Sequence, residues 1–227
     1  MQLGALIPLG DIGGEPSAVR DYAQSVEAMG YDFLEAPDHV LGVNAASRAD
    51  WDMSRNTSKD LFHDPFVLFG FLAGCTTKLG FSTGVLILPQ RQTVLVAKQA
   101  ASLDVLCGGR FRLGIGVGWN EVEFVGLNEN LRNRGRRSEE QVQVMQALTR
   151  AEGRDPAAVG IEVWTSCGAG APADWRKEVA FWKSAGASHI CLTTTFNRRH
   201  HRRIAGHAAA DHLAAMRAYR DAVAEAL

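Results

Sequence analysis

The chain has 227 residues, of which 46% are hydrophobic and 22% charged, and its formal net charge is −1. These values are typical of a soluble globular protein with a sizeable core. The balanced charge gives no reason to expect nucleic acid or an anionic membrane as a partner, and no apolar run approaches the roughly 20 residues that span a bilayer. Because the N-terminus lacks the layout of a signal peptide, we expect a cytoplasmic protein.

The cysteines and histidines give no metal-binding pattern. The four cysteines are far apart and form no CxxC pair, so we expect reduced thiols and no zinc site. Four histidines lie near the C-terminus, but their spacing is irregular and no carboxylate or thiol pattern accompanies them. The residues concerned are Cys75, Cys107, Cys167, Cys191, His200, His201, His207 and His212.

Predicted strands and helices alternate along the whole chain. Helical apolar spacing, Pro65 in a first turn, and Ser138 with Gln141 at capping-box spacing indicate the helices; apolar β-rich runs indicate the strands. The predicted strands cover 3–9, 31–36, 78–88, 112–116, 159–165 and 189–194, and the predicted helices cover 15–29, 64–76, 92–106, 138–149, 174–185 and 209–226.

This alternation makes about six βα units and implies parallel strands with right-handed crossovers. The spacing of the units fits an incomplete (β/α)8 TIM-like barrel or an open doubly wound sheet. No linker or change in composition divides the chain, so we expect one domain over residues 1–227. Polar inserts at 44–62 and 118–137 follow the second and fourth strands, where barrel enzymes place active-site loops.

A glycine-rich run, Gly114-Ile115-Gly116-Val117-Gly118-Trp119-Asn120, follows the fourth strand. Glycine at a strand end lets a ligand approach the backbone closely. A dinucleotide-binding loop fits poorly, because the run leads into a polar loop rather than directly into a helix. A tight turn without a ligand stays an alternative.

Two further features follow or interrupt strands. Asp38 and His39 end the second strand, where a histidine beside an aspartate can shuttle a proton, although such a pair is more often a structural corner. Gly84 interrupts the third strand, which suggests a bulge or the close approach of a planar ligand.

Taken in order, several segments resemble the luciferase-like monooxygenase superfamily, in particular its oxidoreductases that use the deazaflavin coenzyme F420. The resemblance runs without a break over about residues 1–150. It is carried by Gly30-Tyr31-Asp32, Asp38-His39-Val40-Leu41-Gly42, Asp64-Pro65-Phe66, Thr83-Gly84-Val85-Leu86-Ile87-Leu88-Pro89-Gln90-Arg91, Ala97-Lys98-Gln99-Ala100-Ala101, Gly108-Gly109-Arg110, Leu113 to Glu121, and Arg134-Gly135-Arg136-Arg137.

The resemblance implies an oxidoreductase that uses F420 for hydride transfer with a small organic substrate. It places Asp38 and His39 beside the cofactor ring as the catalytic pair, and a non-proline cis peptide at Gly84–Val85. A glutamate that donates a proton in relatives is replaced near Trp119, which leaves His39 as the acid–base candidate. The cofactor-binding residues that it implies are Thr83, Gly84, Val85, Gly116, Gly118 and Asn120.

The chain also departs from the family. After Leu148, about two βα units that carry the cofactor-phosphate site in relatives are absent. The basic run from Asn197 to Arg203 could replace that site, or it could be a solvated loop. Two alternatives therefore stay open: an FMN-dependent monooxygenase, and a truncated ligand-binding or non-catalytic paralogue. Because an incomplete barrel leaves strand edges open, we expect a homodimer, with helices 64–76 and 92–106 at its interface as in relatives.

Overall fold

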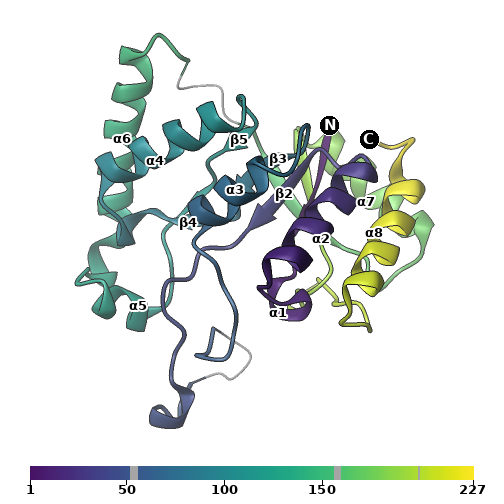
Figure 1. The fold of residues 1–227 in the computed structure, drawn as a ribbon, viewed down its shortest axis with the longest axis horizontal. Coiled ribbons are helices and arrows are strands. Elements are labelled where there is room, and N and C mark those ends of the chain that lie inside the picture. The colour runs from purple at the N-terminus through teal and green to yellow at the C-terminus, as the bar shows by residue number, and fades with distance from the viewer. Residues whose placement is uncertain (52–55, 156–159, 199) are drawn as a thin grey trace. The chain divides into compact units, whose positions relative to one another are not determined.

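A computed structural model describes residues 1–51, 56–155, 160–198 and 200–227 (Figure 1). Strands and helices alternate as the sequence predicts. The strands are β1 (Gln2–Leu6), β2 (Phe33–Ala36), β3 (Gly80–Thr83), β4 (Leu86–Ile87), β5 (Phe111–Arg112), β6 (Ile115–Gly116), β7 (Glu162–Ser166) and β8 (His189–Thr193). The helices are α1 (Leu9–Ile12), α2 (Pro16–Ala28), α3 (Pro65–Ala73), α4 (Thr93–Leu106), α5 (Glu121–Gly126), α6 (Arg134–Ala151), α7 (Pro172–Ser184) and α8 (Ala209–Val223).

The main sheet has six strands in the order β5-β3-β2-β1-β8-β7. The β1–β2, β1–β8 and β8–β7 pairs are parallel, with Gly4 opposite both Phe33 and Cys191, and Cys191 opposite Trp164. Strands β4 and β6 form a separate parallel pair. The α/β class and the six strand positions of an incomplete barrel are therefore confirmed, and the strand order among the described residues runs from one edge to another without closing.

The chain divides into two compact units. The first comprises residues 1–35, 74–81 and 159–227, and the second comprises 36–73 and 82–158. The expectation of a single domain over 1–227 stays a prediction, and the two units are described in turn.

The first unit packs α2, α7 and α8 onto strands β1, β2, β7 and β8. Helix α2 buries the apolar face that its sequence predicts, through Val19, Tyr22 and Val26. Helices α2 and α8 lie side by side (Figure 1), and the Tyr22 hydroxyl donates to the sulfur of Met216 over 3.0 Å. The Tyr31 hydroxyl donates to the Met216 carbonyl over 2.8 Å, so both buried phenols have partners within this core.

The second unit holds α3, α4, α5 and α6. The sequence predicts one strand over 78–88, but the structure divides it in two. Strand β3 ends at Thr83, and the Gly84–Val85 peptide is cis before β4 begins. The fourth position is likewise divided into β5 and β6. Several elements of this unit contribute buried apolar side chains. They are Phe69, Leu72, Leu86, Leu88, Val96, Leu103 and Phe124.

The start of α6 differs from its prediction. The helix begins at Arg134, directly after a 3₁₀ turn whose Asn130 side chain accepts the Arg132 amide. Ser138 therefore lies inside the helix and is buried, and Gln141 donates to the carbonyl of Arg91 instead of completing a cap. The predicted capping box is wrong, because the preceding turn already supplies the entry into the helix. Val159, predicted to begin a strand, lies outside the described residues.

Candidate functional site

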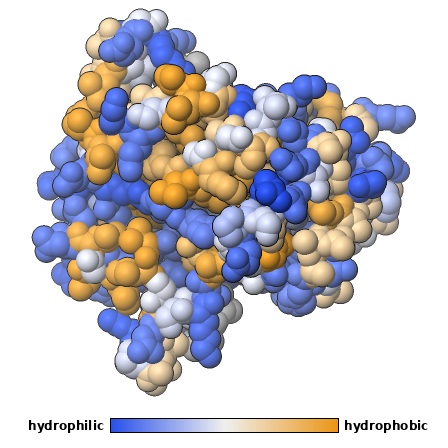
Figure 2. All heavy atoms as spheres, in the orientation of Figure 1, coloured by the Kyte–Doolittle hydropathy of each residue, from blue (hydrophilic) through white to orange (hydrophobic). Residues whose placement is uncertain are grey.

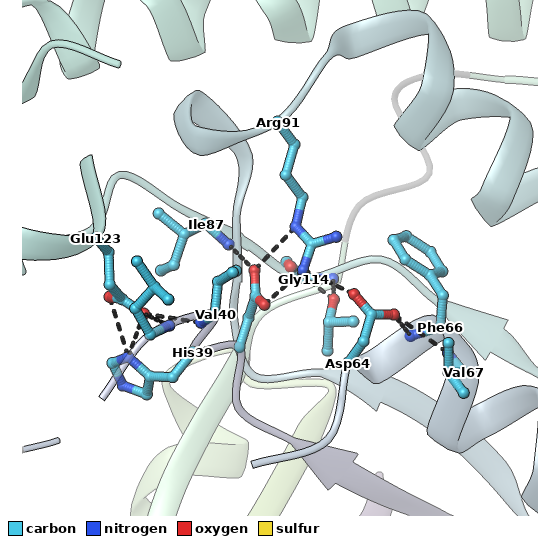
Figure 3. Close-up of polar contacts among 12 residues, drawn as sticks. His39, Val40, Asp64, Phe66, Val67, Ile87, Arg91, Gly114 and Glu123 are labelled. Carbon is cyan, nitrogen blue, oxygen red and sulfur yellow. Dashed lines mark hydrogen bonds and ion pairs between the residues drawn. The ribbon is translucent and has the colours of Figure 1, made fainter. Parts of the chain in front are cut away.

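The loop after β2 begins at a buried ion pair. The Asp38 carboxylate accepts Nη2 of Arg91 over 2.7 Å at one oxygen, and Nε over 3.2 Å at the other. That second oxygen also accepts the amide of Ile87, in β4, over 2.9 Å. Arg91 Nη2 continues to Asp64 over 3.0 Å, so one guanidinium joins two carboxylates (Figure 3). Burial opposes the charged form of Arg91, but the two carboxylates outweigh it and raise its pKa.

This pair shows how Asp38 is used. Its side chain is 1% exposed, and both oxygens are occupied by donors from Arg91 and Ile87. A carboxylate in this state anchors one loop to the neighbouring strand rather than exchanging protons with a ligand. These contacts favour a positioning role for Asp38. A catalytic role for Asp38 stays a prediction.

His39 lies against a second buried carboxylate, Glu123 of α5 (Figure 3). Both oxygens of Glu123 are 3.2 Å from Nδ1 of His39. Oε1 also accepts the amides of Val40 over 2.8 Å and Leu41 over 3.3 Å. Burial tends to raise the pKa of Glu123, but His39 and these two amides outweigh it and lower the pKa. Glu123 is therefore ionised at neutral pH and holds both the histidine and its loop.

Aromatic rings surround the imidazole. The Phe62 ring centroid is 4.7 Å from that of His39, and the Trp119 centroid is 6.1 Å away, both edge-on. Trp51 stacks on Trp119 with a centroid separation of 5.8 Å. Trp51 and Phe62 belong to the first predicted insert, and Trp119 to the second. Both inserts therefore contribute to the surroundings of one histidine, as expected for loops after strands.

Packing alone requires glycine at Gly114 and Gly116, where the segment of β6 approaches β4. Thr83 Oγ1 donates to the Gly114 carbonyl over 2.7 Å and accepts its amide over 2.9 Å. A Cβ added at Gly114 would overlap the Thr83 carbonyl oxygen, and one at Gly116 would overlap the side chain of Val85. These glycines therefore allow two short strands to approach closely, and this requirement exists with or without a ligand.

The cis peptide that the family resemblance implies is present at Gly84–Val85. Val85 itself is exposed, and so are two apolar residues of the neighbouring segment, Ile115 and Val117. Val85 lies on the face of β6 that Gly116 leaves open, so its exposed side chain can contact one face of a planar ring.

Asn120 combines a structural bond with an unused donor. Its Oδ1 accepts the Val122 amide over 3.1 Å and so caps α5, the helix that carries Glu123. Its Nδ2 is buried and has no hydrogen-bond partner among the described residues. A buried donor without a partner is costly, and the carbonyl edge of a bound flavin-type ring would satisfy it. Asn120 Nδ2 is therefore a candidate donor for the predicted cofactor.

All eight predicted site residues lie in the second unit. They are Asp38, His39, Thr83, Gly84, Val85, Gly116, Gly118 and Asn120. Sequence reasoning assigned no role to Glu123, Asn56, Arg91 and Asp64. Arg91 and Asp64 stand inside segments that carry the resemblance, which was the available signal. Glu123 lies 84 positions from His39, and no local pattern links them.

Some residues of the basic run after β8 already have hydrogen-bond partners within the protein. Arg203 Nη2 donates to Asp11 over 2.7 Å, and Asp11 also contacts His207 over 3.1 Å. The Arg202 amide donates to Ser166 Oγ over 3.0 Å, which fixes this loop to the end of β7. Arg199 lies outside the described residues. Replacement of the phosphate site by this run stays a prediction, and Arg203 already has an anionic partner.

The described residues contain no group of three or more His, Cys, Asp or Glu arranged to hold a metal ion. Among the helices in the same residues, none has the length and hydropathy needed to cross a membrane.

Comparison with known proteins agrees with this fold. The family model of luciferase-like monooxygenases matches residues 6–160. The pyrimidine monooxygenase RutA of Bradyrhizobium sp. is 31% identical over 173 residues, which cover 68% of this chain and 45% of that protein.

Two solved structures are similar in fold. An F420-dependent secondary alcohol dehydrogenase in complex with an F420-acetone adduct has a TM-score of 0.54 at 16% identity, covering 99% of this chain and 64% of that one. The oxygenating constituent of 3,6-diketocamphane monooxygenase from Pseudomonas putida, in complex with FMN, has a TM-score of 0.55 at 15% identity. The match covers 100% of this chain and 63% of that one.

The fold is therefore that of an incomplete α/β barrel of the luciferase-like type. The chain belongs to the luciferase-like monooxygenase family. It spans about half the length of the curated relatives it matches.

Proposed function

We propose that this protein is an oxidoreductase that uses coenzyme F420 for hydride transfer with a small organic substrate. The observation that carries the proposal is His39, held by the ionised Glu123 in an aromatic surround after β2. Histidine is the side chain best suited to exchange a proton near neutral pH, and hydride transfer to a carbonyl-type substrate requires a proton partner.

The residues present fit a flavin-type ring. Val85, exposed beside Gly116, offers an apolar contact, and Asn120 Nδ2 offers a buried donor without a partner among the described residues. When bound, F420 supplies the two-electron hydride chemistry, while the protein binds, orients and excludes water. In this arrangement Thr83 and the glycines Gly84, Gly116 and Gly118 shape the strands behind the ring, and His39 exchanges the proton.

The alternative function is an FMN-dependent monooxygenase. The favouring observation is that the 31% identical relative is named a monooxygenase. The ring-binding features described above serve either cofactor, because F420 and FMN share a planar tricyclic ring and differ in one ring atom and in the tail.

Equilibrium titration of the purified protein with F420, reduced F420 and FMN, side by side, tests the proposal. We expect binding of F420, and oxidation of reduced F420 when a panel of small ketones and enones is added. Tight binding of FMN alone would support the monooxygenase instead. Binding of none of the three would support the truncated, non-catalytic paralogue.

A pair of histidine variants sharpens this test. His39→Gln should retain cofactor binding but lose turnover by about 10²-fold or more, the usual contribution of a general acid or base. His207→Gln changes an exposed histidine of the first unit outside the basic run and serves as the control. Equal turnover in the two variants would contradict the role of His39.

We also propose that the protein is a cytoplasmic homodimer. Helices α3 and α4 of the second unit pack together and expose large apolar side chains, including Val105 at 79% and Leu106 at 75%. Val67, Phe71 and Val94 are exposed on the same two helices. Figure 2 shows hydrophobic residues gathered over this region. Several large apolar side chains exposed on one pair of packed helices are typical of an interface between proteins.

A further inference from the structure

We propose that Glu123 is a positioning residue that fixes His39 as the tautomer protonated at Nδ1, so that Nε2 is the nitrogen offered to a bound ligand. The part of this inference that concerns turnover rests on the proposed function. The tautomer itself is a property of the protein alone and can be tested without any ligand.

Two side chains compete for Nδ1 of His39. The carboxylate of Glu123 lies 3.2 Å away and can only accept a hydrogen bond when ionised. The amide nitrogen of Asn56 lies 3.0 Å away and can only donate. In neutral imidazole, Nδ1 either carries a proton or offers a lone pair, so it can satisfy one of these two neighbours but not both.

Charge decides the competition in favour of Glu123. The Glu123 side chain is 2% exposed, and the amides of Val40 and Leu41 stabilise its ionised form. A lone pair on Nδ1 facing this buried anion would be repelled, whereas an N–H at Nδ1 makes a charge-assisted hydrogen bond, about twice as strong as a neutral one. Asn56 loses little, because its amide nitrogen donates to the Leu41 carbonyl over 2.8 Å.

The consequence appears at the other side of the ring. The hydrogen bonds of His39 within the described residues all involve Nδ1, while Phe62 and Trp119 flank the ring without offering an acceptor. With Nδ1 protonated, Nε2 carries the lone pair. It can therefore accept a hydrogen bond from a ligand, or take up a proton and return it, while the ionised Glu123 stabilises the resulting imidazolium.

Nitrogen-15 NMR tests the tautomer in the ligand-free protein. Long-range proton–nitrogen correlation spectra distinguish a protonated from an unprotonated ring nitrogen, and the His39 signals are assigned by their loss in His39→Gln. In spectra of the neutral imidazole, recorded at alkaline pH, we expect an unprotonated Nε2 and a protonated Nδ1. An unprotonated Nδ1 in the wild-type protein would overturn the inference.

The isosteric variant Glu123→Gln tests the cause. Its amide oxygen can still accept the backbone amides, but the negative charge is removed, so we expect the His39 tautomer to shift toward a mixture of both forms. Glu129→Gln is the matched control, since it neutralises a carboxylate of the same unit that pairs with Arg137 instead. An unchanged tautomer ratio in Glu123→Gln would contradict the role. If Glu123→Gln fails to fold, as judged by its amide spectrum, the wild-type spectrum still decides.

Kinetics separates positioning from a general structural effect. In the loaded enzyme, Glu123→Gln should lower kcat by about tenfold with little change in the KM for the cofactor. In a His39→Gln background, the same change should have almost no further effect on kcat, because Glu123 acts through His39. Additive losses would indicate an independent structural role. If no cofactor turns over, the proposed function fails, and the NMR result stands by itself.

Discussion

At the residue scale, two buried carboxylates, Asp38 and Glu123, hold the loop after β2 in different ways. Asp38 is bound on both oxygens by Arg91 and Ile87, which fixes the loop to β4. Glu123 holds the next residue, His39, and two loop amides. Asp38 and His39 are adjacent in the sequence but belong to separate hydrogen-bond networks. The first network anchors the loop to β4, and the second orients the imidazole.

Replacing Asp38 by Asn should destabilise the protein by about 2–4 kcal/mol, because it leaves the guanidinium of Arg91 largely buried with Asp64 as its remaining carboxylate. Urea unfolding measures this loss. Asp104→Asn is the control, since it removes an exposed pair with Arg154 and should cost less than about 1 kcal/mol. Equal midpoints for the two variants would mean that Asp38 is not an anchor.

His212 should make stability depend on mildly acidic pH. It is fully buried between Thr194 Oγ1 at 2.9 Å and Asp11 at 3.1 Å. Burial lowers its pKa despite the attraction of Asp11. The unfolded chain binds the proton at the ordinary value near 6.5, and the folded protein only at lower pH, so stability decreases as pH falls below about 6.5.

The measurement is the urea midpoint from pH 7.5 down to pH 5, in the wild type and in His212→Asn. Each proton taken up on unfolding contributes up to about 1.4 kcal/mol per pH unit. His201, whose pKa burial also lowers, adds a parallel slope in both proteins. The wild type should therefore show the steeper decline, and parallel curves would exclude His212 as the cause.

At the scale of elements, the contact between β4 and β6 depends on glycine. The amide of Leu86 donates to the Gly114 carbonyl over 2.9 Å, and Gly114 lies against the backbone of Thr83. A methyl group there would meet a backbone oxygen, which cannot move aside as a flexible side chain can.

We therefore expect Gly114→Ala to destabilise the protein by about 2 kcal/mol or more, in the manner of an overpacked core. Gly135→Ala, inside α6 with open space around its Cα, is the matched control and should stabilise the protein by about 0.5–1 kcal/mol. Thermal unfolding distinguishes the two. We expect the two substitutions to change the free energy of unfolding in opposite directions. A Gly114→Ala variant of unchanged stability would show that the strands can separate at little cost.

The same scale shows which elements local pattern predicts. The helices over 15–29, 92–106 and 209–226 have ends within three residues of α2, α4 and α8. Short elements were missed: α1 and α5 contain four and six residues, too few for a periodic apolar pattern. Ser138 was misplaced because a cap and a buried helical serine are identical in sequence, and only the turn before α6 separates them.

At the scale of the whole molecule, the apolar face of α3 and α4 gives the dimer prediction its test. Val105→Asp should shift the protein from dimer to monomer in light scattering at micromolar concentration, because a buried unpaired charge at an interface is strongly unfavourable. Val125→Asp, at an exposed apolar position on α5, is the control and should leave the mass unchanged. A wild-type protein that is already monomeric would contradict the proposal.

The sequence by itself determined the α/β class, the six strand positions and the family, because regular periodicity and ordered motifs are local signals. The cis peptide at Gly84–Val85 was implied by the family resemblance. The sequence also placed His39 among the candidate residues. Only the tertiary structure decided how the carboxylates are used. The pairing of His39 with Glu123, and of Asp38 with Arg91, joins residues 84 and 53 positions apart. Such contacts depend on which strands and loops become neighbours, and no spacing along the chain encodes that.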